Sequence, residues 1–404
     1  MKKILIIAPQ FYPIPAVKDG AVEWLITYLI NQNELYKKAQ FYIVSKYDKE
    51  AKRIKHDMTK IYYVKNTESL PFKFIKFIRK LVFNRYTKFI WKKADYKELT
   101  YFGYFCNKIA RKVKPDLIVS EGYDKIHNLW PIIKWFPKEN FFYHLHYSRS
   151  NNELIRKDFP NTIAVSDFVL KKWEFNTSFK GKSIVIKNGI DLKRFSNKTG
   201  NAKEVSREEL GCSQNDFIVL FTGRFRPGKG LIELLNSFSK ITDHHIKLLL
   251  LGDFVAEAKE NEKQFEKDLR IKIKSNKNVI HLGFVPYETI QSYYRISNMQ
   301  IVPSIYDEAA GLVAVEGMSM GLPLVITNSG GMPEYTGNKC AIILERDDHL
   351  QENITKSILM LKENPQLCQE MSLVGKERAK HFSIESFYNN YMNFLLGEEM
   401  VKDE

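Results

Sequence analysis

The feature that most constrains the fold of this chain is a regular alternation of short apolar runs with longer amphipathic segments. In the first half these runs are KKILIIA, AQFYIVS, PDLIVSEG, FFYHLHY, TIAVS and SIVIKNG. Such runs, separated by helix-length segments, are typical of parallel strands joined by crossover helices. The alternation starts again with DFIVLFTGR, IKLLLLGD, NVIHLGF, MQIVPS and LPLVITN, and the helix-like ELLNSFSKI, YETIQSYYRI and LVAVEGMSM lie between them. The sequence therefore predicts two successive α/β domains.

The junction between these domains is predicted near residues 190–200, because KRFSNKTGNAK is polar and contains Gly and Asn like a linker. The chain has 404 residues with 44% hydrophobic content, which is enough for two cores of ordinary size. We expect an N-terminal domain over residues 1–190 and a C-terminal domain over 191–381. A cleft between two such domains is the usual place for a ligand.

Neither a secretory signal nor a membrane span is predicted. The apolar run of MKKILIIAPQ is too short for a signal-peptide core, and no stretch has the length of a transmembrane helix. Four cysteines lie far apart and form no CxxC pair, which argues against a disulfide framework and a zinc knuckle; they are Cys106, Cys212, Cys340 and Cys368. A cytoplasmic location fits this composition.

The positive charge of the chain is concentrated in its first half. Residues 1–200 carry 39 Lys+Arg against 18 Asp+Glu, a net of +21, whereas the remainder carries 23 against 29, a net of −6. This asymmetry suggests that one domain faces an anionic partner. Nucleic acid, a lipid surface and an anionic acceptor all satisfy it.

The densest basic stretch is FKFIKFIRKLVFNRYTKFIWKK, residues 72–93, with eight basic residues and no acidic one. An interfacial helix would bury its aromatic residues among acyl chains, and each cation near anionic head groups would contribute about 1 kcal/mol. The alternative is an amphipathic helix packed on its own domain with a solvated basic face. We favour peripheral docking on an anionic membrane, through Lys73, Lys76, Phe77, Arg79, Lys80 and Trp91.

The segment TGRFRPGKGLIELL places glycines and cations in a turn between a strand and a helix. Backbone N–H groups at a helix start favour an anion, and Arg224 and Lys229 can add charge-assisted hydrogen bonds. A diphosphate would suit this turn. A solvated loop, in which the glycines only permit tight turning, is an equally good interpretation of the spacing alone. The segment matches neither GxGxxG nor GxxxxGK[ST], which disfavours dinucleotide oxidoreductases and P-loop nucleotidases.

A second segment, PSIYDEAAGLVAVEGMSMGLPLVITNSGGMPE, has glutamates on both sides of a small-residue turn that opens a helix. Gly311 allows close backbone approach, and the first helical N–H groups can hold phosphate or ribose oxygens. Because a carboxylate can accept from two hydroxyls, Glu316 suits a ribose diol and Glu308 suits sugar hydroxyls. Isolated glutamates near a helix start more often only complement the helix dipole.

Six stretches of the chain resemble glycosyltransferase family 4, and they occur in the same order as in that family. They are these two segments together with FYPIPAVKDGAVEW, IAVSDFVLKKW, IVIKNGIDLKRF and HLGFVP. The resemblance extends over most of the chain. It implies the GT-B fold, in which two Rossmann-like parallel-sheet domains face each other across a cleft. The N-terminal domain would bind the acceptor, the C-terminal domain would bind a nucleotide-sugar, and residues 382–404 would form a helix that crosses back to the N-terminal domain.

The resemblance also implies roles for individual residues. Arg224 and Lys229 match the pair that contacts the pyrophosphate, and Glu308 matches the glutamate beside the transferred sugar. The other matching donor-binding positions are Gly20 at the phosphates, Phe284 and Val285 at the base, Gly311 and Leu312 at the helix start and Glu316 at the ribose. The sequence departs from similar proteins at Asp19, where many have Gly, and at Ala309-Ala310, where Pro-Phe is common.

His146 matches a histidine near the anomeric centre in similar enzymes. Independently, period-two alternation puts His144 and His146 on the same side of one strand, near the end where open α/β sheets form their clefts. Without the resemblance, a single histidine at a strand end is more often structural. We take His146 and Glu308 as the candidate catalytic residues, with His144 in reserve. No metal or cofactor is expected, because the two cations can stabilise the leaving diphosphate.

The function predicted is therefore a retaining glycosyltransferase acting on surface glycans, with a nucleotide-sugar donor and a glycan acceptor that a lipid can carry. A UDP-sugar is preferred on family frequency. The alternatives are a non-catalytic nucleotide-sugar or nucleic-acid binder and a nucleotide-sugar epimerase of the same fold. Nucleic acid is disfavoured because the basic excess coincides with apolar side chains rather than with a continuous basic groove. The predicted location is the inner face of the cell membrane.

Overall fold

A computed structural model describes residues 1–17, 20–65, 101–122, 126–148, 158–175, 181–196, 204–254 and 260–399. The chain divides into two compact units. The first consists of Met1–Ile186 together with Phe387–Glu404, and the second consists of Lys187–Ser386. The basic segment 72–93, including every predicted membrane-contact residue, lies outside the described residues.

The first unit contains a sheet of seven strands, ordered β3-β2-β1-β4-β5-β6-β7, in which every pairing is parallel. The strands are β1 Lys3–Ile7, β2 Gln40–Lys46, β3 Thr59–Val64, β4 Leu117–Glu121, β5 Phe141–Leu145, β6 Asn161–Ala164 and β7 Ser183–Val185. The helices are α1 Ala21–Tyr36, α3 Tyr101–Val113, α4 Trp130–Ile133 and α6 Asp167–Glu174, followed at the end of the chain by α15 Ile384–Leu396. Because the strand order reverses at β1, the carboxyl ends of β1 and β4 flank a topological switch point.

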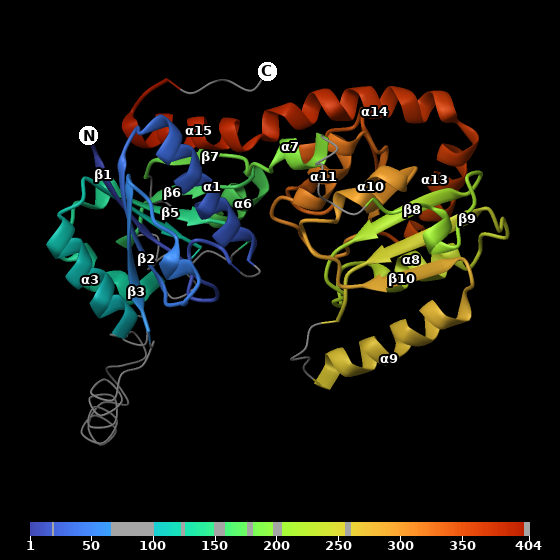
Figure 1. Cartoon of the computed structure of the whole chain (residues 1–404), viewed down its shortest axis with the longest axis horizontal. Helices are drawn as coiled ribbons and strands as arrows, with labels where there is room; N and C mark the ends of the chain where they lie inside the picture. The colour runs from blue at the N-terminus through green and yellow to red at the C-terminus, as the bar shows by residue number, and fades with distance from the viewer. Residues whose placement is uncertain are drawn as a thin grey trace. The chain divides into compact units, whose positions relative to one another are not determined.

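Helix α15 completes the core of this first unit (Figure 1). The backbone N–H of Ser386 donates to Ser383 Oγ at 2.9 Å, which caps the helix start. At its other end Gly397 has φ +76°, and the N–H of Glu398 donates to the carbonyl of Asn393 at 2.8 Å, which closes a Schellman turn. Between these caps five buried side chains pack against the apolar residues of β1, α1 and β2; they are Phe387, Tyr388, Tyr391, Met392 and Leu395.

The second unit contains a parallel sheet of six strands in the order β10-β9-β8-β11-β12-β13. The strands are β8 Phe217–Thr222, β9 Ile246–Leu251, β10 Val279–Gly283, β11 Met299–Val302, β12 Leu324–Thr327 and β13 Ala341–Leu344. The helices are α7 Leu192–Ser196, α8 Leu231–Phe238, α9 Glu260–Ser275, α10 Gln291–Ile296, α11 Leu312–Met320, α12 Met332–Thr336, α13 Leu350–Glu363 and α14 Pro365–Ala379. A separate apolar core joins α8, α9, α13 and α14 to this sheet.

Two parallel α/β sheets confirm the predicted fold class, and every apolar run singled out in the sequence contains a strand. Two edge strands were not predicted. In β3, Lys60 is exposed and the tyrosines are half-buried, so the apolar alternation of this strand is concealed. The strand β13 is short, with four residues. None of the helices within the described ranges combines the length and the apolarity that a membrane span requires.

The packing of α15 predicts that the first unit depends on the last helix of the chain for stability. Met392 is fully buried, so Met392→Ala should lower the free energy of unfolding by about 2–5 kcal/mol, through lost apolar burial and a residual cavity. Met360 on α13 is 39% exposed, and Met360→Ala should change it by less than about 0.5 kcal/mol. Urea unfolding followed by circular dichroism measures both. Equal midpoints for the two variants would contradict this role of α15.

Candidate functional site

The glycine-containing turn after β8 is held against the loop that follows β11. Gly228 accepts hydrogen bonds through its carbonyl from the N–H of Ile305 at 2.8 Å and of Tyr306 at 3.3 Å. Gly230 has φ +71°, and a Cβ there would lie 1.8 Å from the carbonyl oxygen of Pro303. Only glycine fits this approach, because a side chain would collide with backbone. The turn therefore brings Lys229 beside the residues that precede α11.

Lys229 and Glu308, both predicted as site residues, form an ion pair between a half-buried lysine and a buried glutamate, with 2.7 Å between Nζ and Oε1. The same oxygen accepts from Ser304 Oγ at 2.6 Å, and Tyr306 donates its hydroxyl to Oε2 at 2.9 Å. Burial disfavours the ammonium, but the charge of Glu308 and the hydrogen bonds of Glu308 and Tyr306 outweigh it and raise the pKa of Lys229. Lys229 is therefore a fixed cation, and Glu308 is a carboxylate already oriented by three donors.

Helix α11 places the second glutamate in a different environment. Gly311 begins the helix with φ +74°, and a Cβ there would lie 2.7 Å from Met332 Cγ. Glu316 is buried one turn later, where it accepts from the Tyr294 hydroxyl at 2.7 Å. Desolvation raises the pKa of Glu316 to about 7, although the Tyr294 hydrogen bond and the charge of Arg194 oppose the shift. The carboxylate is thus poorly compensated, and hydroxyl donors from a ligand would stabilise it.

The remaining predicted residues of the second unit lie on loops and at the helix start. Arg224 is exposed in the turn after β8, and Leu312 is half-buried at the first position of α11. Phe284, which is 69% exposed, and Val285 follow β10 directly. An exposed aromatic ring beside a strand end is available for stacking on a flat ligand. The sequence did not predict the hydroxyl donors Ser304, Tyr306 and Tyr294, because nothing in their spacing marks them as partners of the glutamates.

In the first unit, Gly20 stands at the start of α1 with φ +132°. This backbone conformation favours glycine, because L side chains rarely adopt it. Glu23 itself is buried, and its burial raises its pKa against the opposing hydrogen bonds from backbone N–H groups. The predicted approach of Gly20 to a phosphate stays a prediction.

Four polar side chains meet at the carboxyl ends of β4 and β5 in the first unit. The parallel register places Glu121 opposite His144, and His146 follows the last residue of β5. Glu121 Oε2 lies 2.8 Å from His144 Nδ1 and 2.7 Å from His146 Nε2, while Tyr391 donates its hydroxyl to Oε1 at 2.6 Å. We call this group the Glu121 network. Although burial opposes the charge of Glu121, the two histidines hold its pKa well below the usual range.

Within the described ranges, Glu121, His144 and His146 are close enough together to be considered as metal ligands. Ligand atoms of a tetrahedral site, each about 2.0–2.2 Å from the ion, stand roughly 3.3–3.6 Å apart. Here Oε2 is 2.7 and 2.8 Å from the two ring nitrogens, which are hydrogen-bond distances. The present arrangement fits a hydrogen-bonded network better than a metal site. The expectation that no metal is required stays a prediction.

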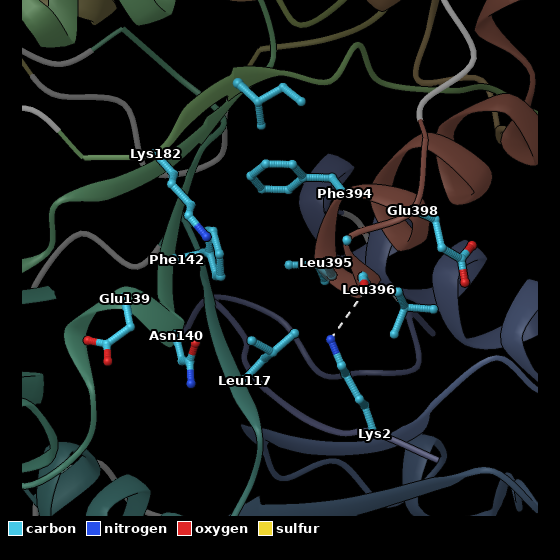
Figure 2. A pocket seen from close by; sticks show the side chains of 12 residues that line it. Lys2, Leu117, Glu139, Asn140, Phe142, Lys182, Phe394, Leu395, Leu396 and Glu398 are labelled. Atoms are coloured by element: carbon cyan, nitrogen blue, oxygen red, sulfur yellow. Dashed lines mark hydrogen bonds between the residues drawn. The ribbon is translucent and has the colours of Figure 1, made fainter.

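A pocket in the first unit lies at the opposite edge of the sheet (Figure 2). Lys2 precedes β1, Asn140 precedes β5 and Lys182 precedes β7, so the pocket opens at the amino ends of the strands. Lys2 Nζ donates to the carbonyl of Leu396 at 3.3 Å, which ties the end of α15 to this wall. None of the predicted site residues lines it. Because ligands of open α/β sheets bind at the carboxyl ends, we do not place the candidate site here.

Comparison with known proteins defines the class to which this fold belongs. The crystal structure of Anabaena HepE in complex with UDP and glucose covers 98% of this chain and all of its own, with a TM-score of 0.72 and 18% identity. The two parallel-sheet α/β units therefore have the GT-B fold of glycosyltransferases. At this level of identity the likeness establishes the fold alone.

The second unit carries a more specific signature. Residues 202–378 match the family model described as glycosyl transferases group 1. The matched stretch includes Arg224, Lys229, Glu308 and Glu316. An uncharacterized glycosyltransferase of Methanocaldococcus jannaschii is 32% identical over 40% of this chain and 40% of its own length. The lipopolysaccharide 1,2-N-acetylglucosaminetransferase of Salmonella typhimurium is 29% identical over 33% of this chain and 36% of its own. The chain thus spans well under half of the length of these relatives, and its match to the group 1 glycosyltransferase model lies in residues 202–378.

The raised pKa of Glu316 predicts a pH-dependent cost of burial. Between the ordinary value of 4.5 and about 7 the folded state binds more protons than the unfolded state, so stability falls as pH rises. At pH 8 the permanently neutral Glu316→Gln variant should therefore have a free energy of unfolding up to about 3 kcal/mol higher than the wild type, and so a higher melting temperature. This gain should disappear near pH 4.

Calorimetric melting curves at the two pH values measure this difference. The exposed Glu363 on helix α13 of the same unit provides the control, and Glu363→Gln should show no comparable gain at pH 8. If Glu316→Gln melts below the wild type at pH 8, the carboxylate is stabilised by its surroundings and our account of its burial is wrong.

Proposed function

We propose that this protein is a retaining glycosyltransferase that moves a hexosyl group from a nucleotide-sugar donor to a glycan acceptor. The observation that carries the proposal is the cluster of Lys229, Glu308, Gly311 and Glu316 at the carboxyl ends of β8 and β11, within a group 1 glycosyltransferase domain. It offers a cation for phosphate, a helix start for an anion, and two carboxylates for hydroxyl groups. A nucleotide-sugar carries the matching phosphates and hydroxyl groups.

In the proposed complex, Arg224 and Lys229 bind the diphosphate and Glu316 accepts hydrogen bonds from the ribose. Phe284 and Val285 contact the base, and Gly311 and Leu312 present backbone N–H groups to the phosphate. Lys229 must then share its ammonium between the diphosphate and Glu308, which leaves the Glu308 carboxylate free to accept from hydroxyls of the sugar. We take a UDP-sugar as the donor, which is supported by the UDP and glucose named with the HepE structure.

In the proposed reaction, the bond between the anomeric carbon and the leaving diphosphate breaks while the acceptor oxygen attaches on the same face of the sugar. The proton of the acceptor hydroxyl passes to an oxygen of the diphosphate. The protein must then chiefly stabilise negative charge on the leaving group, and two cations do so without a metal. His146 and Gly20 are the residues of the first unit that we assign to this reaction.

Removal of either cation tests this assignment. Arg224→Ala and Lys229→Ala should each lower kcat by roughly 100-fold or more, because each removes a charge that stabilises the transition state. Lys356 is exposed and pairs with Glu352 one helical turn away, so Lys356→Ala is the matched control and should leave turnover unchanged. Release of UDP from a UDP-sugar, with and without acceptor, measures the rates. Near-normal turnover in both cation variants would remove the proposed diphosphate site, and loss of activity in EDTA would contradict the metal-independent reaction.

We further propose that the acceptor is carried by a lipid and that the protein works at the cytoplasmic face of the membrane. The support is the sequence of residues 72–93, in which eight basic residues are interspersed with large apolar ones. The relative from Salmonella typhimurium is named for action on lipopolysaccharide, whose name denotes a glycan joined to a lipid. An enzyme that acts on anchored glycans gains by concentrating on the same surface.

Liposomes test the membrane proposal. Wild-type protein should sediment with vesicles that contain anionic lipid, and salt should weaken but not abolish binding, since buried aromatic residues contribute independently of charge. Gln at positions 73, 76, 79 and 80 should remove the salt-sensitive part, and Ser at positions 77 and 91 should weaken the remainder. Failure of the wild type to sediment with anionic vesicles at low salt would favour a soluble acceptor.

A further inference from the structure

The Glu121 network was not anticipated from the sequence beyond its two histidines, and its geometry is more specific than a simple ion pair. Glu121 is 1% exposed and accepts three hydrogen bonds, from His144, His146 and Tyr391. An ionised carboxylate can only accept hydrogen bonds, so each atom facing it must carry a hydrogen. The network therefore requires a proton on Nδ1 of His144 and on Nε2 of His146.

The opposite nitrogens of the two rings are in a different situation. Among the described residues, Nδ1 of His146 and Nε2 of His144 are buried and meet no hydrogen-bond partner. The pKa of His146 is lowered to about 4, first by burial and then by the nearby His144, against the opposing effect of Glu121. At neutral pH His146 is therefore a neutral imidazole whose Nδ1 keeps a lone pair. Buried polar atoms of this kind are normally satisfied by water or by a ligand.

The surroundings leave His146 little freedom to rotate. Its side chain is 4% exposed, and the ring centroid lies 4.0 Å from that of His144. Gly122, with φ +57°, lies beneath it, and a Cβ at this position would approach His146 Cδ2 to 3.1 Å. Glu121 fixes the edge that bears Nε2. The ring therefore presents Nδ1 in one orientation at the carboxyl end of β5, where open α/β sheets bind ligands.

We propose that Glu121 is a positioning residue for sugar transfer, which holds the His146 ring so that Nδ1 accepts a hydrogen bond from a hydroxyl of a bound sugar, and that Tyr391 holds Glu121. This inference rests on the proposed function, and it adds to it a carboxylate on β4 and a hydroxyl from the C-terminal helix. Tyr391 comes from α15, 270 residues further along the chain than Glu121. Helix α15 is thus linked to His146 through the two hydrogen bonds that Glu121 accepts, one from Tyr391 and one from His146.

Nitrogen NMR of the full-length protein tests the protonation pattern without any activity assay. The chain has nine histidines, and the His144→Asn and His146→Asn variants assign the two signals. Long-range proton-nitrogen spectra of the histidine-labelled wild type at neutral pH should show a bare Nδ1 in His146 and a protonated Nδ1 in His144. A protonated Nδ1 in His144 would show that this atom donates to Glu121. A protonated Nδ1 in His146 would overturn the proposal.

Steady-state kinetics test the positioning role. Glu121→Gln keeps the shape of the side chain but removes the charge, and it should lower kcat by roughly 10- to 100-fold, as expected for lost hydrogen bonds to a charged acceptor, with little change in the donor KM. Tyr391→Phe removes one hydroxyl and should lower kcat by roughly 3- to 10-fold. Tyr42→Phe is the matched control, because the Tyr42 hydroxyl donates to the exposed Gln40 and lies outside the Glu121 network, and its kcat should equal that of the wild type.

The outcomes separate the positioning role from the proposed function. A purely structural Glu121 would reduce the amount of folded protein but leave kcat per folded molecule unchanged, and that result would overturn the positioning role alone. A stoichiometric metal ion in the purified protein, with both histidines as ligands, would also overturn it. If the wild type transfers sugar from no donor, both the proposed function and the role of Glu121 in it fail together.

Discussion

Carboxylates buried at the carboxyl ends of two parallel sheets are the constraint on which the candidate chemistry depends. Moving an ionised carboxylate out of water costs several kcal/mol unless donors or cations replace the lost solvation. The structure answers this cost in three ways. Glu121 has three donors, Glu308 has a lysine and two hydroxyls, and Glu316 has one tyrosine and a more distant arginine.

These three environments suit different tasks. Glu121 is fully satisfied by its own chain and is best placed to orient other groups. Glu308 shares its ammonium partner with any anion that enters the turn at Lys229, so its hydrogen bonds can be exchanged when a ligand arrives. Glu316 is the least compensated, since desolvation raises its pKa, and so it gains most from hydroxyl groups that a ligand would supply. Local structure and charge thus divide the work between residues of one chemical type.

The sequence was sufficient for the fold class because parallel strands that are buried on both faces appear as continuous apolar runs. It missed β3, where Lys60 and two half-buried tyrosines conceal the apolar alternation, and it missed β13, although the edge strands β7 and β10 were found. Within the site, Lys229 and Glu308 could be predicted as members but not as partners, because their contact depends on the adjacency of β8 and β11 in the sheet. Glu121 was missed, although a charged residue at the end of the apolar run PDLIVS is itself a sign of a candidate site residue. Its link to Tyr391 could not be predicted, since only the folded core brings α15 to that strand.

The discontinuous first unit has a consequence for the order in which the chain acquires structure during synthesis. Residues 1–186 leave the ribosome first, but the apolar surface that Phe387, Tyr388 and Met392 cover must wait for the end of the chain. At translation rates of about 5–20 residues per second, the intervening 200 residues (187–386) take roughly 10–40 s to appear. The second unit, although encoded later, is complete before the first. During synthesis the N-terminal unit is therefore the last to complete its core. Until α15 has been synthesised, the apolar surface of this unit stays exposed to chaperones.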